Sequence, residues 1–353
     1  MRILVTGGTG FVGAHSTRAL VAAGHDVTLL VRDAAGVQPA LRPLGINPER
    51  CRIVTGDVLD GAAVASAARD ADALLHAANV YSFNAADAER MTRVNVEGTR
   101  SVLRAAAENG LDPIVHVSST VALLPAGHVT PESPVGTPHG VYLRSKAEAE
   151  TIARELQQEG APVVVTNPGP VHGPHDPHVG ESASLVRDIL RGRARILLRG
   201  AYGIVDVRDV ATAHARLFIP GRGPRRYLMG GHHIEFAGLF RLLERVVGHR
   251  LRAVPVPYRL AYAAGRAAEV AQRRGIDPGF SSVEVWISAH YATTDDSATV
   301  RDLGVTWRPP EQSLRDCVAW LHERGLVSSR QAGSAAGGRW QADGAVDAES
   351  ETG

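Results

Sequence analysis

The chain has 353 residues, of which 44% are hydrophobic and 21% are charged, and its formal net charge at pH 7 is +1. This composition predicts a globular protein of one large or two moderate domains, and the balanced charge gives no reason to expect a nucleic-acid partner. No apolar run approaches the roughly 20 residues that span a bilayer, so we expect no membrane span. Two cysteines make no disulfide framework and Met1 is followed by a strand pattern rather than a signal peptide, so we expect a cytoplasmic location.

The first thirty residues predict a nucleotide-binding unit. An apolar strand, Arg2 to Val5, runs into a glycine-rich turn, and a helix follows it to about Ala23 with Gly24 as its cap. Glycines at this spacing permit a tight turn, close approach of the backbone to a pyrophosphate and close packing of helix on strand. The helix N-terminus favours the anion. We therefore expect a dinucleotide to bind at Gly7, Thr9, Gly10, Phe11, Val12 and Gly13.

A second strand, Asp26 to Val31, completes the strand-helix-strand unit, and Arg32 follows it directly. The adenosine ribose of a bound dinucleotide is expected at this position, where an arginine suits a 2′-phosphate. NADP is therefore the preferred cofactor. Asp33 keeps NAD as the alternative, because an inward carboxylate there would hydrogen-bond the ribose hydroxyls instead.

The alternation of strands and helices continues through Arg52 to Thr55, Ala73 to Ala77, Ile114 to Ser118 and Val163 to Asn167, which read as strands. The sequence thus predicts an α/β fold with a Rossmann-like doubly wound parallel sheet. Ligands of such sheets bind beyond the carboxyl ends of the strands. Further cofactor contacts are expected there at Asp57, Val58, Ala77, Ala78 and Asn79, although Asp57 also suits a helix cap and the alanines suit tight packing.

Lys146 is the only lysine among the 38 lysine and arginine residues of the chain. In so arginine-rich a sequence, a lysine is expected where a compact ammonium is needed. Tyr142 lies four positions earlier, so a helix through both residues places them on one face. A nearby cation lowers the pKa of a phenol, and we expect Tyr142 to exchange protons with a substrate oxygen. An exposed tyrosine beside a solvated lysine is the alternative.

Seven motifs follow one another along the chain: Thr6 to Gly13, Asp57-Val58, His76 to Ala78, Asn95 to Thr99, Val117 to Ser119, Tyr142 to Lys146 and Asn167 to Val171. In this order they resemble extended short-chain dehydrogenase/reductases, also called NAD-dependent epimerase/dehydratases, over roughly residues 1 to 235. The resemblance implies that Ser119, with Ser118 as the alternative, is the catalytic serine and that Tyr142 is the proton donor and acceptor. It further implies that Lys146 binds the nicotinamide ribose and polarises the tyrosine, and that Pro168 and Val171 contact the cofactor.

Within that family the chain looks most similar to the branch of dihydroflavonol reductases and 3β-hydroxysteroid dehydrogenases, judged by Arg32 and by Ile204 to Ala211. This implies an NAD(P)-dependent oxidoreductase that interconverts a ketone or aldehyde and an alcohol on a small, largely apolar molecule. A nucleotide-sugar epimerase or dehydratase is the alternative on the same fold. The diphosphate of a nucleotide sugar would need arginines in the C-terminal half. The candidates could form such a site or a solvated surface, and they are Arg187, Arg191, Arg193, Arg195 and Arg199.

An alternative of another class is a regulatory protein that senses NADP(H) without turnover. The complete set of Ser119, Tyr142 and Lys146 argues against it, because a sensor needs no proton-transfer pair. The resemblance also implies a possible homodimer through the two helices that end at Asn109 and Gln158.

The substrate side begins with a loop rich in proline and glycine that carries histidines at 172, 175 and 178. No helix can hold this spacing on one face and no glutamate completes a motif, so we expect no metal site. We expect an apolar substrate pocket instead, with core packing as the alternative for each aromatic residue. Its candidate residues are Tyr81, Phe83, His172, His175 and Tyr202.

The predicted domain organisation has a dinucleotide-binding domain at 1–170, to which 200–230 returns, and a substrate lobe at 171–199 and 231–327. The lobe is mostly helical, with helices expected at Phe236 to Val247, Pro257 to Arg274 and Ser313 to Arg324. The apolar run from Val254 to Ala268 is short and broken by prolines and arginines, so we expect a lobe helix, with interfacial membrane contact as the alternative. Residues 328–353 are rich in serine, glycine, alanine and acidic residues and are expected to be disordered.

Overall fold

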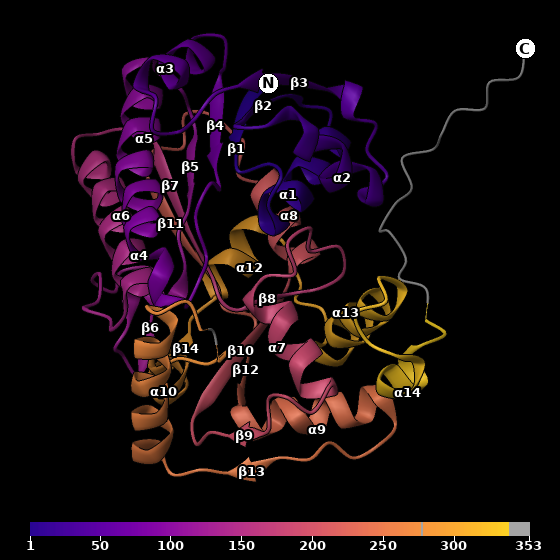
Figure 1. Cartoon of the computed structure of the whole chain (residues 1–353). Coiled ribbons are helices and arrows are strands. Elements are labelled where there is room, and N and C mark those ends of the chain that lie inside the picture. The colour runs from indigo at the N-terminus through magenta and orange to yellow at the C-terminus, as the bar shows by residue number, and fades with distance from the viewer. Residues whose placement is uncertain (277, 339–353) are drawn as a thin grey trace, which may run out of the picture.

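The computed structural model describes residues 1–276 and 278–338, and at its centre lies a seven-stranded parallel sheet (Figure 1). The strand order is β11-β7-β5-β4-β1-β2-β3. The strands are β1 (Arg2–Thr6), β2 (Asp26–Val31), β3 (Cys51–Thr55), β4 (Ala73–His76), β5 (Ile114–Val117), β7 (Val163–Pro168) and β11 (Arg225–Met229). The predicted doubly wound sheet is confirmed, and only β11 was not predicted.

Helices cover both faces of this sheet (Figure 1). Successive residues of each inner strand point to opposite faces, so Ile3 and Val5 join one buried cluster while Leu4 joins the other. Both faces of the inner strands are therefore buried, so the sequences of these strands are continuous apolar runs. The helices on one face are α1 (Phe11–Ala22), α2 (Val37–Leu41) and α8 (Val207–Ala215), and those on the other are α3 (Gly61–Arg69), α5 (Thr99–Glu108) and α6 (Val141–Gln158).

The direction of chain progression reverses between β1 and β4. The sheet grows from β1 through β2 to β3 on one side and from β4 through β5 to β7 on the other. Thr6 pairs with His76 and His76 pairs with His116, so the carboxyl ends of β1, β4 and β5 meet at one edge. Doubly wound sheets bind their ligands in the crevice at such a reversal.

A second body of structure packs at that carboxyl edge. It contains a three-stranded sheet of β8 (Val171–His172), β10 (Ala201–Asp206) and β12 (His232–Glu235), covered by α7 (Glu181–Leu190), α9 (Phe236–Val247) and α13 (Pro310–Glu323). These helices enclose their own apolar cluster, which includes Leu239, Leu243, Leu314 and Leu321. Among the described residues, no helix is long and apolar enough to cross a membrane.

The remaining elements connect these two bodies or lie at their edges. They are α4 (Ala88–Thr92), a π-helical segment (Arg93–Gly98), β6 (His128–Val129), β9 (Ile196–Leu197), β13 (Val254–Pro255), α10 (Tyr258–Gln272), α11 (Ser282–His290), β14 (Thr293–Thr294), α12 (Ser297–Leu303) and α14 (Ser329–Ala332). The helices expected at 236–247, 257–274 and 313–324 are therefore present as α9, α10 and α13.

The expectation of disorder from residue 328 onward is wrong for the part that the structure describes. Ser328 and Gln331 form a capping box that begins α14. Ala332 and Ala335 are fully buried in the apolar cluster of the lobe. These two alanines pack the segment against the lobe. Composition alone does not predict this packing, because the alanines lie among polar residues in the sequence. Residues 339–353 lie outside the described part of the chain.

A buried ion cluster joins the central sheet region to the lobe. Arg208, at the start of α8, is 6% exposed, and its Nη2 lies 2.8 Å from Asp206 Oδ2 and 2.7 Å from Asp316 Oδ2 on α13. The segment from Ile204 to Ala211, which suggested a branch of the family, therefore has a structural role. Removing one member of a buried ion pair leaves an uncompensated charge.

Arg208→Met is accordingly expected to lower the free energy of unfolding by about 3–5 kcal/mol, since it leaves Asp206 buried without its partner. Urea denaturation followed by far-ultraviolet circular dichroism measures the loss. Arg301→Met is the matched control, because the Arg301 side chain is 69% exposed in its pair with Asp302 and should change stability by no more than about 0.5 kcal/mol. Equal stability of the two variants would contradict a linking role for Arg208.

Candidate active site

The glycine turn between β1 and α1 has the geometry of a dinucleotide cradle. Gly7 has a φ of +75°, and a Cβ built on it would lie 2.5 Å from the backbone nitrogen of Ala78. A Cβ on Gly13 would overlap the Gly7 carbonyl oxygen. Gly10 begins α1 without a side-chain cap, and no acidic residue lies in the first turn. The first N–H groups of α1 are thus available to an anion, so these residues fit the pyrophosphate of a dinucleotide.

The other cofactor candidates surround this turn. Ala77 N donates to Thr6 O at 3.0 Å, and the exposed Asn79 donates to Ala77 O at 3.4 Å. Asp57 accepts a hydrogen bond from Leu59 N at 3.0 Å within a turn, whereas the helix cap that was its alternative role belongs to Asp60. Further candidates in this region are Val58, which is buried, and Thr9, Phe11 and Val12 at the start of α1.

Two charged residues follow β2. Arg32 is exposed. Asp33 uses its carboxylate locally, because it accepts a hydrogen bond from Ala35 N at 2.9 Å and caps the short helix Ala34–Gly36. One oxygen of the carboxylate that favours NAD is therefore bonded to the backbone of its own turn.

Tyr142 and Lys146 lie in the first two turns of α6 and are both buried, at 8% and 3% exposure. The Lys146 Nζ donates to the carbonyl oxygen of Val117, at the end of β5, at 2.8 Å. Burial lowers the pKa of Lys146 to about 8, and the Glu150 carboxylate opposes this shift. The ammonium is thus the main form at neutral pH, and it is held against the carboxyl edge of the sheet.

The expected lowering of the Tyr142 pKa is not found. Burial raises the pKa of the Tyr142 phenol above its ordinary value, and the carboxylate of Glu181 raises it further. The reason is that loss of water around the phenol outweighs the attraction of the Lys146 ammonium, which binds a carbonyl oxygen instead. Tyr142 is therefore a neutral phenol at pH 7 and is equipped to donate a proton.

The two candidate serines differ in their partners. Ser118 is buried and its Oγ donates to Glu150 Oε2 at 2.7 Å. Ser119 is half-buried; its Oγ donates to Pro168 O at 3.3 Å and accepts from Val121 N at 3.4 Å. Both bonds of Ser119 are long, so its hydroxyl is the more available of the two.

Glu150 is a site residue that the sequence argument missed. Its carboxylate is fully buried and accepts hydrogen bonds from Ser118, from Asn167 Nδ2 at 2.6 Å and from Arg154 Nε at 2.9 Å. Asn167 also donates to Ser119 O at 3.1 Å. Glu150 thereby joins α6 to the ends of β5 and β7. Its only signal in the sequence is a position four residues after Lys146, on the same helix face.

Asn95 supports the neighbouring loop from the π-helical segment. Its side chain bonds both the N–H and the carbonyl of Val80, at 2.7 and 3.0 Å, and donates to Ser145 Oγ at 2.9 Å. Asn95 therefore ties the backbone of the loop after β4 to the first turns of α6.

Two of the aromatic candidates lie against the Tyr142 ring. The ring centroids of Tyr81 and Phe83 are 4.7 and 5.9 Å from that of Tyr142. Phe83 N donates to Glu181 Oε1 at 3.1 Å, which fixes this loop to the start of α7. Glu181 was also missed by the sequence argument. The loop after β4 therefore supplies an aromatic wall beside the phenol.

The lobe contributes Tyr202 and His172 as a pair. His172 Nε2 lies 3.1 Å from Tyr202 Oη, and the Tyr202 ring packs edge-on against Phe236. His175 turns away toward Trp320 on α13, with ring centroids 6.3 Å apart. Burial lowers the pKa of both histidines to about 4, so they are neutral at pH 7. Over residues 1–276 and 278–338, no three His, Cys, Asp or Glu side chains are grouped so as to hold a metal ion.

Pro168 and Val171 lie where β7 leads into the lobe. Pro168 O accepts the Ser119 hydroxyl, and Val171 pairs with Val205 of β10. The cofactor candidates and the substrate candidates are thus joined by this short connection.

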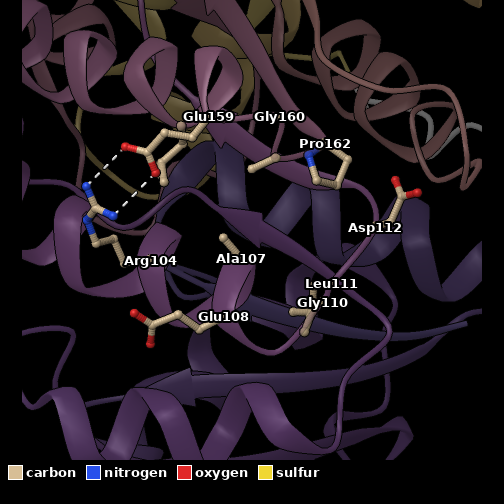
Figure 2. A pocket seen from close by; sticks show the side chains of 11 residues that line it. Arg104, Ala107, Glu108, Gly110, Leu111, Asp112, Glu159, Gly160 and Pro162 are labelled. Atoms are coloured by element: carbon tan, nitrogen blue, oxygen red, sulfur yellow. Dashed lines mark hydrogen bonds and ion pairs between the residues drawn. The ribbon is translucent and has the colours of Figure 1, made fainter.

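A separate hollow lies between the C-terminal ends of α5 and α6 (Figure 2). Arg104 and Glu159 form an ion pair across it, with Arg104 Nη2 3.4 Å from Glu159 Oε1. The residues that line it include Asp112 and Pro162 but none of the candidate site residues. It is therefore not part of the candidate active site.

The pKa of Lys146 predicts a pH limit for cofactor binding. As pH rises through about 8, the ammonium is lost, and the affinity for NADPH should fall with it. Glu150→Gln removes the charge that opposes the lowering of this pKa, so the midpoint of the loss should move to lower pH. Titrating the protein with NADPH by fluorescence at a series of pH values measures the midpoint.

Glu148→Gln, an exposed change on the same helix, is the matched control and should leave the midpoint in place. An unchanged midpoint in folded Glu150→Gln protein would contradict the electrostatic link between Glu150 and Lys146.

Comparisons with known proteins agree with this geometry. The sequence model of the NAD dependent epimerase/dehydratase family matches residues 3–230. Sterol demethylase protein B of Methylococcus capsulatus is 30% identical over 338 residues, covering 93% of this chain and 100% of the relative. A putative dihydroflavonol 4-reductase of Synechocystis is 31% identical over 337 residues, covering 92% and 96%. The crystal structure of UDP-glucose 4-epimerase from Bifidobacterium longum with NAD⁺ and UDP superposes with a TM-score of 0.71 at 18% identity, covering 92% of this chain and 99% of that one.

Proposed function

The chain belongs to the NAD-dependent epimerase/dehydratase family and is an enzyme of the extended short-chain dehydrogenase type, and from this we propose that it is an NADP-preferring reductase. Its proposed reaction interconverts a ketone or aldehyde and an alcohol on a small, largely apolar molecule. The observation that carries the proposal is the buried Tyr142 phenol, which lies one helical turn before the buried Lys146 on α6 and is walled by Tyr81 and Phe83.

In the proposed mechanism, the glycine turn and Lys146 would hold NADPH, which would supply a hydride for the carbonyl carbon. Ser119 Oγ donates a hydrogen bond to the substrate oxygen and orients it. Tyr142 Oη transfers its proton to that oxygen, which becomes the hydroxyl of the product. The resulting tyrosinate is stabilised by the Lys146 ammonium until the phenol regains a proton from solvent.

The surroundings of the site favour an apolar substrate over a sugar nucleotide. Two of the five arginines that a diphosphate could use have other partners: Arg187 Nε pairs with the adjacent Asp188 at 2.9 Å, and Arg195 donates to Gly192 O at 2.5 Å. Arg193 and Arg199 are exposed. The two relatives whose names mention a sterol and a dihydroflavonol support a ring-containing, apolar carbonyl compound as the substrate class.

The proposed homodimer would join α5 and α6 of two copies. The outward residues of these helices are largely charged and include Arg100, Arg104, Arg144, Glu148 and Glu155, all exposed. Interface cores are depleted of charged residues, so the proposed dimer rests on the family resemblance and not on the composition of this face.

The proposed roles predict the effects of substitutions at the site. Tyr142→Phe should lower kcat about 10²- to 10⁴-fold with NADPH affinity largely kept, because it removes only the proton donor. Lys146→Arg should be nearly as damaging as Lys146→Ala, because a buried guanidinium has different donor directions, and both should also weaken NADPH binding. Ser119→Ala should act mainly on kcat.

Steady-state kinetics at the absorbance band of the reduced nicotinamide tests these expectations with a panel of ring-containing ketones and aldehydes. Tyr258→Phe, at an exposed tyrosine, is the control and should keep full turnover. Conversion of UDP-sugars without net change of the cofactor would support the epimerase instead, and NADPH binding without any turnover would support the sensor. Wild-type turnover of Lys146→Arg would contradict the role of Lys146.

Arg32 is proposed to contact the 2′-phosphate of NADP, because it is exposed after β2 while Asp33 is engaged with Ala35. Arg32→Ala should therefore reduce kcat/KM for NADPH roughly 10- to 100-fold while leaving that for NADH nearly unchanged, as expected for one charge-assisted hydrogen bond. Arg50→Ala, at another exposed arginine that precedes β3 at the opposite end of the sheet, is the control. Equal losses with both cofactors, or a wild-type preference for NADH, would contradict this assignment.

A further inference from the structure

The outward face of α10 is apolar. Leu260, Ala263, Ala264, Ala267 and Val270 are all exposed and recur at helical spacing, so they form one stripe along the side of the helix that faces solvent. Leu260 and Val270 are 64% and 48% exposed. A helix that packs on a protein core normally turns its large apolar residues inward, and this helix does the reverse.

The stripe lies in a segment of the chain where exposed apolar residues are concentrated. The described part of the chain has nine exposed large hydrophobic residues, and five of these nine lie between residues 254 and 276. They are Val254, Tyr258, Leu260, Val270 and Ile276. Single exposed apolar residues need no explanation, but a contiguous group indicates an interaction surface.

Contacts on the inner side hold α10 in this orientation. Gly265 packs so closely on the backbone of Ser282 that a Cβ would overlap it. The buried Glu269 carboxylate accepts a hydrogen bond from Ser282 N at 3.1 Å, and Gln272 Oε1 accepts from Ala85 N at 3.2 Å. The helix therefore cannot roll its stripe into the core without breaking these bonds.

The charge along α10 is positive. Residues 258–276 contain four arginines and one acidic residue, a net charge of +3 in a chain whose total is +1. The acidic residue, Glu269, is buried and paired with Arg266 at 2.9 Å. Arg259, Arg266 and Arg273 are exposed and seven residues apart, so they follow one edge of the apolar stripe.

We propose that α10 docks the enzyme on an anionic lipid bilayer. The apolar stripe would lie at the boundary of headgroups and acyl chains, with Arg259, Arg266 and Arg273 on lipid phosphates. The helix has 15 residues, which is too short to span a bilayer but suits an orientation in the plane of the surface. A second copy of the chain fits less well, because an α10 to α10 contact would bring two positive patches together.

The position of α10 connects this surface to the candidate site. Through Gln272 it contacts Ala85, two residues after Phe83, and Tyr262 Oη lies 3.1 Å from the ring of His139, shortly before Tyr142. Docking would thus hold the aromatic wall near the membrane, where apolar carbonyl compounds partition. This last point rests on the proposed function, whereas docking itself does not.

Cosedimentation with phosphatidylcholine vesicles, with and without phosphatidylglycerol, tests the docking of the full chain. We expect binding to the vesicles that contain phosphatidylglycerol, with an affinity that falls as salt is raised. Leu260→Glu combined with Val270→Glu should weaken binding at least 10-fold, and Arg259→Gln combined with Arg273→Gln roughly 30-fold, as expected for two surface arginines. Leu260→Trp should show a blue shift of its emission on adding the anionic vesicles.

Matched controls change the same residue types elsewhere. Ile219→Glu combined with Val300→Glu alters exposed apolar residues, and Arg69→Gln combined with Arg90→Gln alters exposed arginines, so both should bind vesicles as the wild type does. NADPH titration verifies that each variant keeps its cofactor site. Equal vesicle binding by all variants, or no binding by the wild type, would overturn the proposal. A dimer would also overturn the proposal if sedimentation velocity detects it in the wild type and not in Leu260→Glu combined with Val270→Glu. A second copy of the chain would then occupy this face.

Discussion

The buried carboxylate of Glu150 is the constraint on which the arrangement of the candidate site depends. A carboxylate without water is costly unless it is fully hydrogen-bonded, and its donors come from β5, β7 and the next turn of α6. Those three elements must therefore meet at one point. Ser119 follows directly on one of these donors, Ser118, and Lys146 lies one turn before Glu150, so the same bonds that compensate the buried charge also place both residues.

Burial shifts the pKa values of Lys146 and Tyr142 in opposite directions. It disfavours the ammonium of Lys146 and the phenolate of Tyr142, so the pKa of the first falls and that of the second rises. Glu150 opposes the shift at Lys146, which stays charged at neutral pH, while Glu181 adds to the effect of burial at Tyr142, which is neutral. The site thus carries a charge at Lys146, the proposed ribose side, and none at Tyr142, the proposed substrate side.

The sequence predicted the features that depend on local pattern. The strands of the central sheet and the glycine turn have periodic or short-range signals, and α9 occupies the predicted range Phe236–Val247. What could not be predicted depends on contacts between distant segments. β11 begins with two arginines and does not read as a buried strand, the partners of Glu150 include Ser118, 32 residues away, and the pKa of Tyr142 depends on how much water the folded loops exclude.

The single lysine of the chain has a consequence for chemical labelling. Reagents that acylate amines have only the N-terminal amine and Lys146 to attack in the whole sequence. Lys146 is 3% exposed, and its pKa near 8 leaves a larger neutral, nucleophilic fraction at pH 7 than an ordinary lysine has. Acylation at this position therefore reports how often the buried end of β5 opens to solvent, without interference from any other side-chain amine.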